Sequence, residues 1–184
     1  MIFIYFFIIL ICFLIAVFVS LFLLTQIVAH LTTVAPFVPI PEEIIPEIVK
    51  NLHLNNNSVL YDLGCGDGRV LMEAIKSNQN MRAVGIEKAL VPYLLARFYT
   101  RGNKNVKIRR EDIFTTNVSD ATVIFFYLFP GVPDKLMSVL EKKCNLGVQV
   151  VSCDFDCKER KPVEVIDLNN INSKRGKKLF VYTI

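Results

Sequence analysis

The first 41 residues of the chain contain no Asp, Glu, Lys or Arg. From Ile2 to Leu24 nearly every residue is Ile, Phe, Leu or Val, so a helix here would be apolar on every face. At about 1.5 Å per residue, this helix is long enough to cross the roughly 30 Å of hydrocarbon in a bilayer. Such a segment is not an amphipathic surface helix. It predicts one membrane-spanning helix that contacts the lipid bilayer through residues 2–24.

A cleaved signal peptide is the competing interpretation of this segment. A signal peptide begins with basic residues, has a shorter apolar core and ends at a small-residue cleavage site. This chain has no Lys or Arg near its start, and no A-x-A motif follows the apolar run. Basic residues occur only downstream, and they tend to stay on the cytoplasmic side. We therefore expect a single-pass membrane protein whose folded domain faces the cytoplasm.

The rest of the chain has the composition of an ordinary globular domain. All of the charge, including the net +4, belongs to Glu42–Ile184, and acidic and basic residues alternate there, which argues against a nucleic-acid partner. Five cysteines and two histidines show no zinc-site spacing, so we expect no metal. Three prolines interrupt Thr32–Pro41. The expected parts are a membrane anchor and exit (1–31), a linker with a pre-core helix (32–52) and a folded domain (53–184).

The folded domain shows alternating strand and helix patterns. This alternation predicts an α/β fold with a Rossmann-like, doubly wound, mostly parallel sheet of seven strands, and the closing hairpin predicts an antiparallel edge strand. Ligands of such sheets bind at the carboxyl ends of the strands. The expected strands are 58–61, 81–86, 106–109, 121–128, 147–152, 162–168 and 178–183, and the expected helices are 41–52, 70–77, 89–99 and 133–143.

A glycine-rich loop follows the first expected strand and precedes a helix. Its glycines allow a sharp turn and a close approach of the backbone to a ligand. A dinucleotide-binding loop has the spacing G-x-G-x-x-G, whereas the third glycine here comes one residue early. The two carboxylates of the loop would repel a pyrophosphate, but they suit the ammonium group of S-adenosylmethionine (SAM). We expect cofactor contacts from Asp62, Leu63, Gly64, Cys65, Gly66, Asp67 and Gly68.

Acidic residues also end the second and third expected strands. Glu87 lies about 20 residues beyond the loop, where an acid can accept hydrogen bonds from both ribose hydroxyls. Asp112 could accept a hydrogen bond from the adenine amino group, and the backbone N–H of Ile113 could donate one to the ring. An acid at a turn or at the start of a helix is the alternative interpretation of Asp112.

These motifs resemble the class I SAM-dependent methyltransferases across nearly all of Glu42–Ile184. The matching segments are DLGCGDGR (62–69), VGIEKA (84–89) and REDIF (110–114). A membrane span followed by APFVP (35–39) is similar to the membrane-anchored lysine methyltransferases that modify adenine nucleotide translocase and the ATP synthase c-subunit, and to their prokaryotic relatives. The resemblance implies that Pro36, Phe37 and Pro39 help to close the site. The chain departs from the mitochondrial members at Cys65 and at Lys88-Ala89.

The resemblance implies transfer of a methyl group from SAM to a lysine amine of a membrane-associated protein. A lipid headgroup or a small lipophilic molecule is an alternative acceptor, and a SAM-binding membrane protein without turnover is an alternative of another class. The acceptor pocket is expected at the ends of the fourth and fifth strands, with Tyr127 and Asp154 as candidate catalytic residues. YLFP (127–130) replaces the Asn-Pro-Pro-Tyr type of motif of DNA amino-methylases, which argues against a nucleic-acid acceptor.

Overall fold

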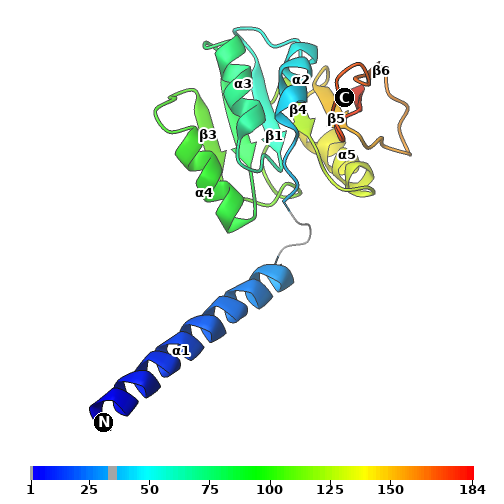
Figure 1. Ribbon diagram of the computed structural model, residues 1–184. Helices are drawn as coiled ribbons and strands as arrows, with labels where there is room; N and C mark the ends of the chain where they lie inside the picture. The colour runs from blue at the N-terminus through cyan, green and yellow to red at the C-terminus, as the bar shows by residue number, and fades with distance from the viewer. Residues whose placement is uncertain (1, 33–36) are drawn as a thin grey trace. The chain divides into compact units, whose positions relative to one another are not determined.

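The computed structural model describes residues 2–32 and 37–184, with side chains for residues 3–26 and 37–184 (Figure 1). The chain forms two compact units, Met1–Pro36 and Phe37–Ile184. The first contains a single helix, α1 (Ile2–Thr32), and the second contains the sheet and all of the other described helices.

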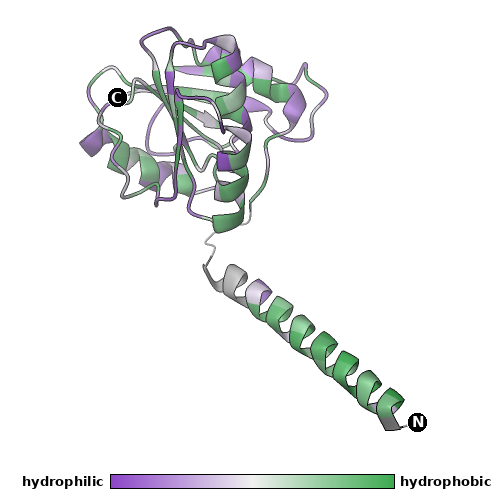
Figure 2. Ribbon diagram, turned by 90° about the vertical axis from the view of Figure 1, so that its left-hand side faces the viewer, coloured by the Kyte–Doolittle hydropathy of each residue, from purple (hydrophilic) through white to green (hydrophobic). Residues whose placement is uncertain are grey.

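Helix α1 is apolar along its described side chains, as the uniform green of most of its length in Figure 2 shows. Within its own unit, every side chain between Phe3 and Gln26 is exposed. The hydroxyl of Thr25 donates to the carbonyl of Phe22 at 2.6 Å, so this polar group is satisfied within the helix. By length and composition, Phe3–Gln26 could cross a membrane.

The second unit contains the expected mostly parallel sheet of seven strands. The strand order is β3-β2-β1-β4-β5-β7-β6. The first five strands are parallel, whereas β7 is antiparallel to both of its neighbours and lies one strand inside the edge strand β6. The strands are β1 (Val59–Leu63), β2 (Arg82–Ile86), β3 (Val106–Arg109), β4 (Val123–Phe126), β5 (Gln149–Cys153), β6 (Glu164–Asp167) and β7 (Lys178–Thr183).

Two hydrophobic cores fill the two faces of the sheet, which confirms the doubly wound class. One core joins the sheet to η1, α2, α3 and α4, and the other joins it to α5 and to the loops after β3 and β5. Strands β1 and β4 are buried along their whole length, as expected for strands covered on both faces. The helices are η1 (Glu42–Ile44), α2 (Ile45–Asn51), α3 (Arg69–Ser77), α4 (Leu90–Tyr99) and α5 (Val132–Lys143).

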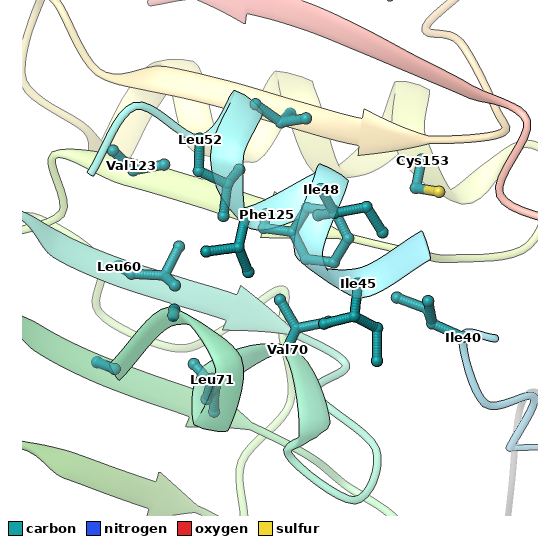
Figure 3. Packing of buried hydrophobic residues seen from close by; sticks show 14 of the residues in the cluster. Ile40, Ile45, Ile48, Leu52, Leu60, Val70, Leu71, Val123, Phe125 and Cys153 are labelled. Atoms are coloured by element: carbon teal, nitrogen blue, oxygen red, sulfur yellow. The ribbon is translucent and has the colours of Figure 1, made fainter. Parts of the chain in front are cut away.

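The pre-core helix, η1 and α2, packs directly on the sheet. Figure 3 shows Ile48 of α2, and Leu52 directly after this helix, beside Phe125 of β4. Leu60 of β1 and Val70 of α3 lie close by. Pro46 stands in the first turn of α2, where it removes no helical hydrogen bond. The helix from the expected linker region therefore forms part of the hydrophobic core.

This packing predicts the effect of removing the central aromatic ring. Replacing Phe125 with Ala should lower the free energy of unfolding by about 3–5 kcal/mol, because the substitution leaves a cavity between α2 and β4. The measurement is urea unfolding of the full-length protein in detergent, followed by near-ultraviolet circular dichroism. Leu146→Ala is the matched control, since Leu146 is 93% exposed. Equal midpoints for the two variants would contradict this description of the core.

Candidate functional site

The glycine-rich loop begins where β1 ends. Gly64, Gly66 and Gly68 have φ values of +84°, +57° and +82°, a region that residues with a Cβ atom rarely adopt. The turn is held by the carbonyl of Ile86 in β2, which accepts hydrogen bonds from the N–H groups of Gly64 (2.8 Å) and Cys65 (3.0 Å). The loop therefore makes the sharp turn that the glycine pattern predicts.

Two apolar side chains from distant segments lie against the loop. A Cβ atom on Gly66 would collide with Cε2 of Phe37, and a Cβ atom on Gly64 would stand 2.8 Å from Cδ2 of Leu128. Phe37 comes from the segment before η1, which the resemblance assigned to site closure, and Leu128 follows β4. Pro36, from the same segment, lies outside the described residues.

Glu87 at the end of β2 connects that strand to the loop. Its carboxylate accepts hydrogen bonds from the N–H of Gly66 at 3.1 Å and from the N–H of Ala89 at 2.8 Å. Burial raises the pKa of Glu87, although these backbone hydrogen bonds oppose the shift. Each carboxylate oxygen has a second lone pair, so the side chain can still accept from the hydroxyls of a ribose.

Asp62 is the most unusual polar group of the site. Its side chain is almost completely buried, and among the described residues its Oδ2 is the one buried side-chain oxygen or nitrogen without a hydrogen-bond partner. Burial, and after it the charges of Glu87 and Asp67, raise the pKa of Asp62 to about 8. A buried carboxyl group that lacks a partner is costly unless a ligand supplies one. The ammonium group of SAM has the complementary charge, so the residues present fit this cofactor.

Asp67, the second acid of the loop, already has a partner. Nη2 of Arg69 lies 2.6 Å from Oδ2 of Asp67, and Nε of Arg69 donates to Oδ1 at 2.9 Å. The same guanidinium group donates from Nη1 to the carbonyl of Ile40 at 2.9 Å. Arg69 thus fastens the segment that carries Phe37 to the cofactor loop. The sequence alone suggested no role for Arg69, although an arginine two residues after an acid in a tight loop was a usable signal.

Asp112 lies in a turn beyond the end of β3. Its Oδ1 accepts from the N–H of Phe114 at 2.9 Å, and its Oδ2 pairs with Nζ of Lys88 at 3.0 Å. The hydrogen bond from Phe114 and the charge of Lys88 lower the pKa of Asp112. Ile113, the next residue, is half-buried against the second core. The turn role weighed for Asp112 is therefore present, and unused lone pairs remain on its carboxylate.

Tyr127 and Asp154, the candidate acceptor residues, are brought together at the ends of β4 and β5. Burial first, and then the nearby Asp154 carboxylate, raise the pKa of Tyr127, while Arg175 opposes the shift. The carboxylate of Asp154 accepts from the N–H groups of Gly176 (2.7 Å) and Lys177 (2.6 Å). Asp154 thus holds the basic loop between β6 and β7 beside Tyr127.

In the described part of the chain, no group of three or more His, Cys, Asp or Glu side chains is arranged to hold a metal ion. Within the glycine loop, burial raises the pKa of the Cys65 thiol, so this cysteine remains protonated.

Comparisons with known proteins agree with this geometry. A family model described as the ANTKMT methyltransferase domain matches residues 62–164. A protein-lysine N-methyltransferase from Saccharolobus islandicus (strain REY15A) is 32% identical over 149 residues, which cover 79% of this chain and 92% of that protein. A lysine N-methyltransferase of the ATP synthase c-subunit from Caenorhabditis elegans is 27% identical over 132 residues, which cover 67% of this chain and 68% of that protein.

A solved structure has the same fold over most of the chain. The crystal structure of an RNA methyltransferase from Salinibacter ruber in complex with S-adenosyl-L-homocysteine superposes with a TM-score of 0.72 at 33% sequence identity. The match covers 80% of this chain and 94% of the other.

The geometry of Glu87 predicts a measurable effect on cofactor affinity. Replacing Glu87 with Ala should weaken SAM binding by about 1.5–3 kcal/mol, roughly a factor of 10 to 150, because a charged hydrogen-bond acceptor is lost. Calorimetry on the full-length protein in detergent measures this change. Glu164→Ala, on the exposed edge strand β6, is the control and should bind normally. A folded Glu87→Ala protein with normal affinity would contradict the assignment of Glu87.

The raised pKa of Asp62 predicts that SAM binding releases a proton near pH 7. The free protein keeps Asp62 protonated there, since its pKa is about 8 rather than the ordinary 3.8, and an adjacent ammonium group would favour the ionised form. For the same reason, the stability of the free protein should fall as the pH rises from about 4 toward 8.

Calorimetry in two buffers with different ionisation enthalpies measures the released proton. We expect release at pH 7 in the wild type and none in Asp62→Asn, which cannot titrate. Release that persists in Asp62→Asn would assign the proton to another group and refute this role of Asp62.

Proposed function

Because the chain belongs to the ANTKMT methyltransferase family, we propose that this SAM-dependent methyltransferase acts on a lysine amine of a membrane-associated protein. The family match and the relatives confirm the resemblance that the sequence motifs indicated, and they confirm SAM as the cofactor. The lysine acceptor is supported by the protein-lysine methyltransferase from Saccharolobus islandicus, because the alignment covers 92% of that protein.

The observation that best supports a SAM site here is the buried, unpaired carboxyl group of Asp62. It lies next to a loop whose glycines have positive φ values. In our proposal Asp62 binds the ammonium group of SAM, and Glu87 binds the ribose hydroxyls. Asp112 and the N–H of Ile113 bind the adenine. The bound cofactor supplies a methyl group on a positively charged sulfur. Leu63, Gly64, Cys65, Gly66, Asp67 and Gly68 shape the backbone that surrounds it.

The acceptor amine must lose its proton before it can act as a nucleophile. We place the amine near Tyr127, where Arg175 is close enough to influence the tyrosine hydroxyl. Loss of water on entering the pocket lowers the pKa of a lysine, so no separate base is needed. Tyr127 stays a neutral phenol whose oxygen can accept a hydrogen bond from the amine and orient it. Asp154 contributes by holding the loop that carries Arg175.

The membrane placement is part of the proposal. Phe3–Gln26 is long and apolar enough to cross a bilayer, and all Lys and Arg residues lie after it. We propose a single-pass protein with its catalytic domain in the cytoplasm, where it meets acceptors held in or near the same membrane. An acceptor at the membrane would then share the confinement of the enzyme, which raises its effective concentration.

Transfer of labelled methyl groups tests the acceptor. Wild-type protein incubated with methyl-labelled SAM and membranes should label material that protease digests and organic solvent does not extract. Hydrolysis of that material should yield methylated lysine. The Glu87→Ala protein should label at least about tenfold less, since its donor site is impaired.

Each other outcome identifies a different function. Label that organic solvent extracts would indicate a lipid or a lipophilic acceptor. Label that ribonuclease removes would indicate RNA, the substrate class named for the Salinibacter ruber enzyme. Absence of transfer by a protein that binds SAM would favour the non-catalytic alternative.

A further inference from the structure

Helix α4 carries an unusual number of exposed apolar side chains for a helix packed on a folded domain. Only Pro92 and Ala96 of its residues are buried. Among the large apolar side chains of residues 37–184, eleven are exposed, and six of these belong to α4, where they are 38–67% exposed. The six are Leu90, Val91, Leu94, Leu95, Phe98 and Tyr99.

Most of these side chains lie on one side of the helix. At about 3.6 residues per turn, Leu90, Leu94 and Phe98 form one row, and Val91 and Leu95 form the adjacent row. Together they span an arc of roughly 140°, and the buried Ala96 lies nearly opposite its centre. The apolar face of α4 therefore points away from the domain. Within residues 37–184 this face has no partner.

A continuous basic segment accompanies this face. Residues 88–110 contain seven Lys and Arg residues and no Asp or Glu, so the rest of the chain carries a net negative charge. Lys88 is paired with Asp112, but among the described residues no carboxylate forms an ion pair with Arg97, Arg101 or Lys104. These bases belong to α4 and to the loop that connects it to the edge strand β3.

Two of the basic side chains, one in α4 and one just after it, lie against aromatic rings of α4. The guanidinium carbon of Arg101 lies 4.1 Å from the centre of the Phe98 ring, and that of Arg97 lies 5.8 Å from the centre of the Tyr93 ring. Such stacking keeps the charged groups at the border of the apolar face. Apolar side chains flanked by bases are typical of helices that lie in the interface of an anionic membrane.

We propose that α4 is a second membrane contact, which lies in the headgroup region of a bilayer containing anionic lipid. The inference rests on the proposed anchoring by α1. Only ten residues lie between Gln26 and Phe37, so Phe37 stays within roughly 40 Å of the end of the span, and docking becomes an intramolecular event. The exposed aliphatic residues favour a lipid surface over RNA, because a nucleic-acid site relies on bases and aromatic platforms rather than on leucines.

Docking of α4 would also place the donor site at the membrane surface. Glu87, which binds the loop N–H of Gly66, accepts a second hydrogen bond from Ala89, the residue that precedes α4. At the other end of the helix, Ala96 and Thr100 lie against Gly68 of the loop. The helix that touches the lipid would therefore also support the cofactor loop.

The absence of tryptophan from the chain permits a direct test. Full-length Leu94→Trp and Phe98→Trp proteins are reconstituted into vesicles of phosphatidylcholine and phosphatidylglycerol, with or without brominated acyl chains that quench nearby tryptophan. Leu146→Trp, at an exposed site outside α4, is the control. We expect brominated lipid to reduce the emission of the first two variants by about half and to leave the control nearly unchanged.

A charge variant tests the lipid preference. Arg101→Glu combined with Lys104→Glu, in the Leu94→Trp background, should remove most of the quenching, whereas Lys135→Glu combined with Lys142→Glu, at exposed positions of α5, should not. Vesicles of pure phosphatidylcholine should also reduce the quenching, because the electrostatic attraction is lost.

Flotation of the vesicles separates the two proposals. A protein that does not float with the vesicles refutes the anchoring and with it this inference. A protein that floats, but whose tryptophans in α4 remain unquenched, refutes only the docking of α4. Emission that responds to single-stranded RNA and not to brominated lipid would show that the surface binds RNA, and would also overturn the docking.

Discussion

The site depends on one costly arrangement, a carboxyl group buried without a partner at the end of β1. Asp62 belongs to a strand that is covered on both faces, so water cannot solvate it, and the nearby Glu87 and Asp67 oppose its ionisation. The free protein keeps the group protonated. A cationic ligand would remove this cost. A site for a cationic cofactor such as SAM can therefore be built from acids, whereas a pyrophosphate site needs unpaired backbone N–H groups.

The surrounding structure holds this arrangement through the backbone rather than through side-chain packing alone. Ile86 holds the glycine turn by its carbonyl, and Glu87 binds the N–H of Gly66. Arg69 connects Asp67 to the carbonyl of Ile40, so the segment that carries Phe37 is fixed to the glycine loop. The position of Phe37 over Gly66 thus follows from a hydrogen-bond network that begins inside the loop.

Acidic and basic side chains gather in different parts of the domain. Acids gather around the glycine loop, where we propose that a positively charged ligand binds. The segment 88–110, in contrast, is purely basic and borders the apolar face of α4. The mild net charge of +4 hides this separation, because it sums a basic surface and an acidic remainder. Charge counted over the whole chain is therefore a poor guide to its partners. Acids and bases are interleaved in the rest of the domain, and this average pattern concealed the basic segment beside α4.

The sequence by itself determined the apolar helix, the α/β class, the glycine loop and the acids at the strand ends. These features depend on local patterns: hydrophobic periodicity, glycine at left-handed φ values, and an acid directly after a strand. Tertiary structure decided which of these acids already have partners. Arg69 neutralises Asp67, Lys88 pairs with Asp112 and a backbone loop occupies Asp154, while Asp62 remains unpaired. Such pairings join residues that only the folded chain brings together. The same holds for α4: its apolar face can be identified as the outward one only because the fold buries Pro92 and Ala96 on the other side of the helix.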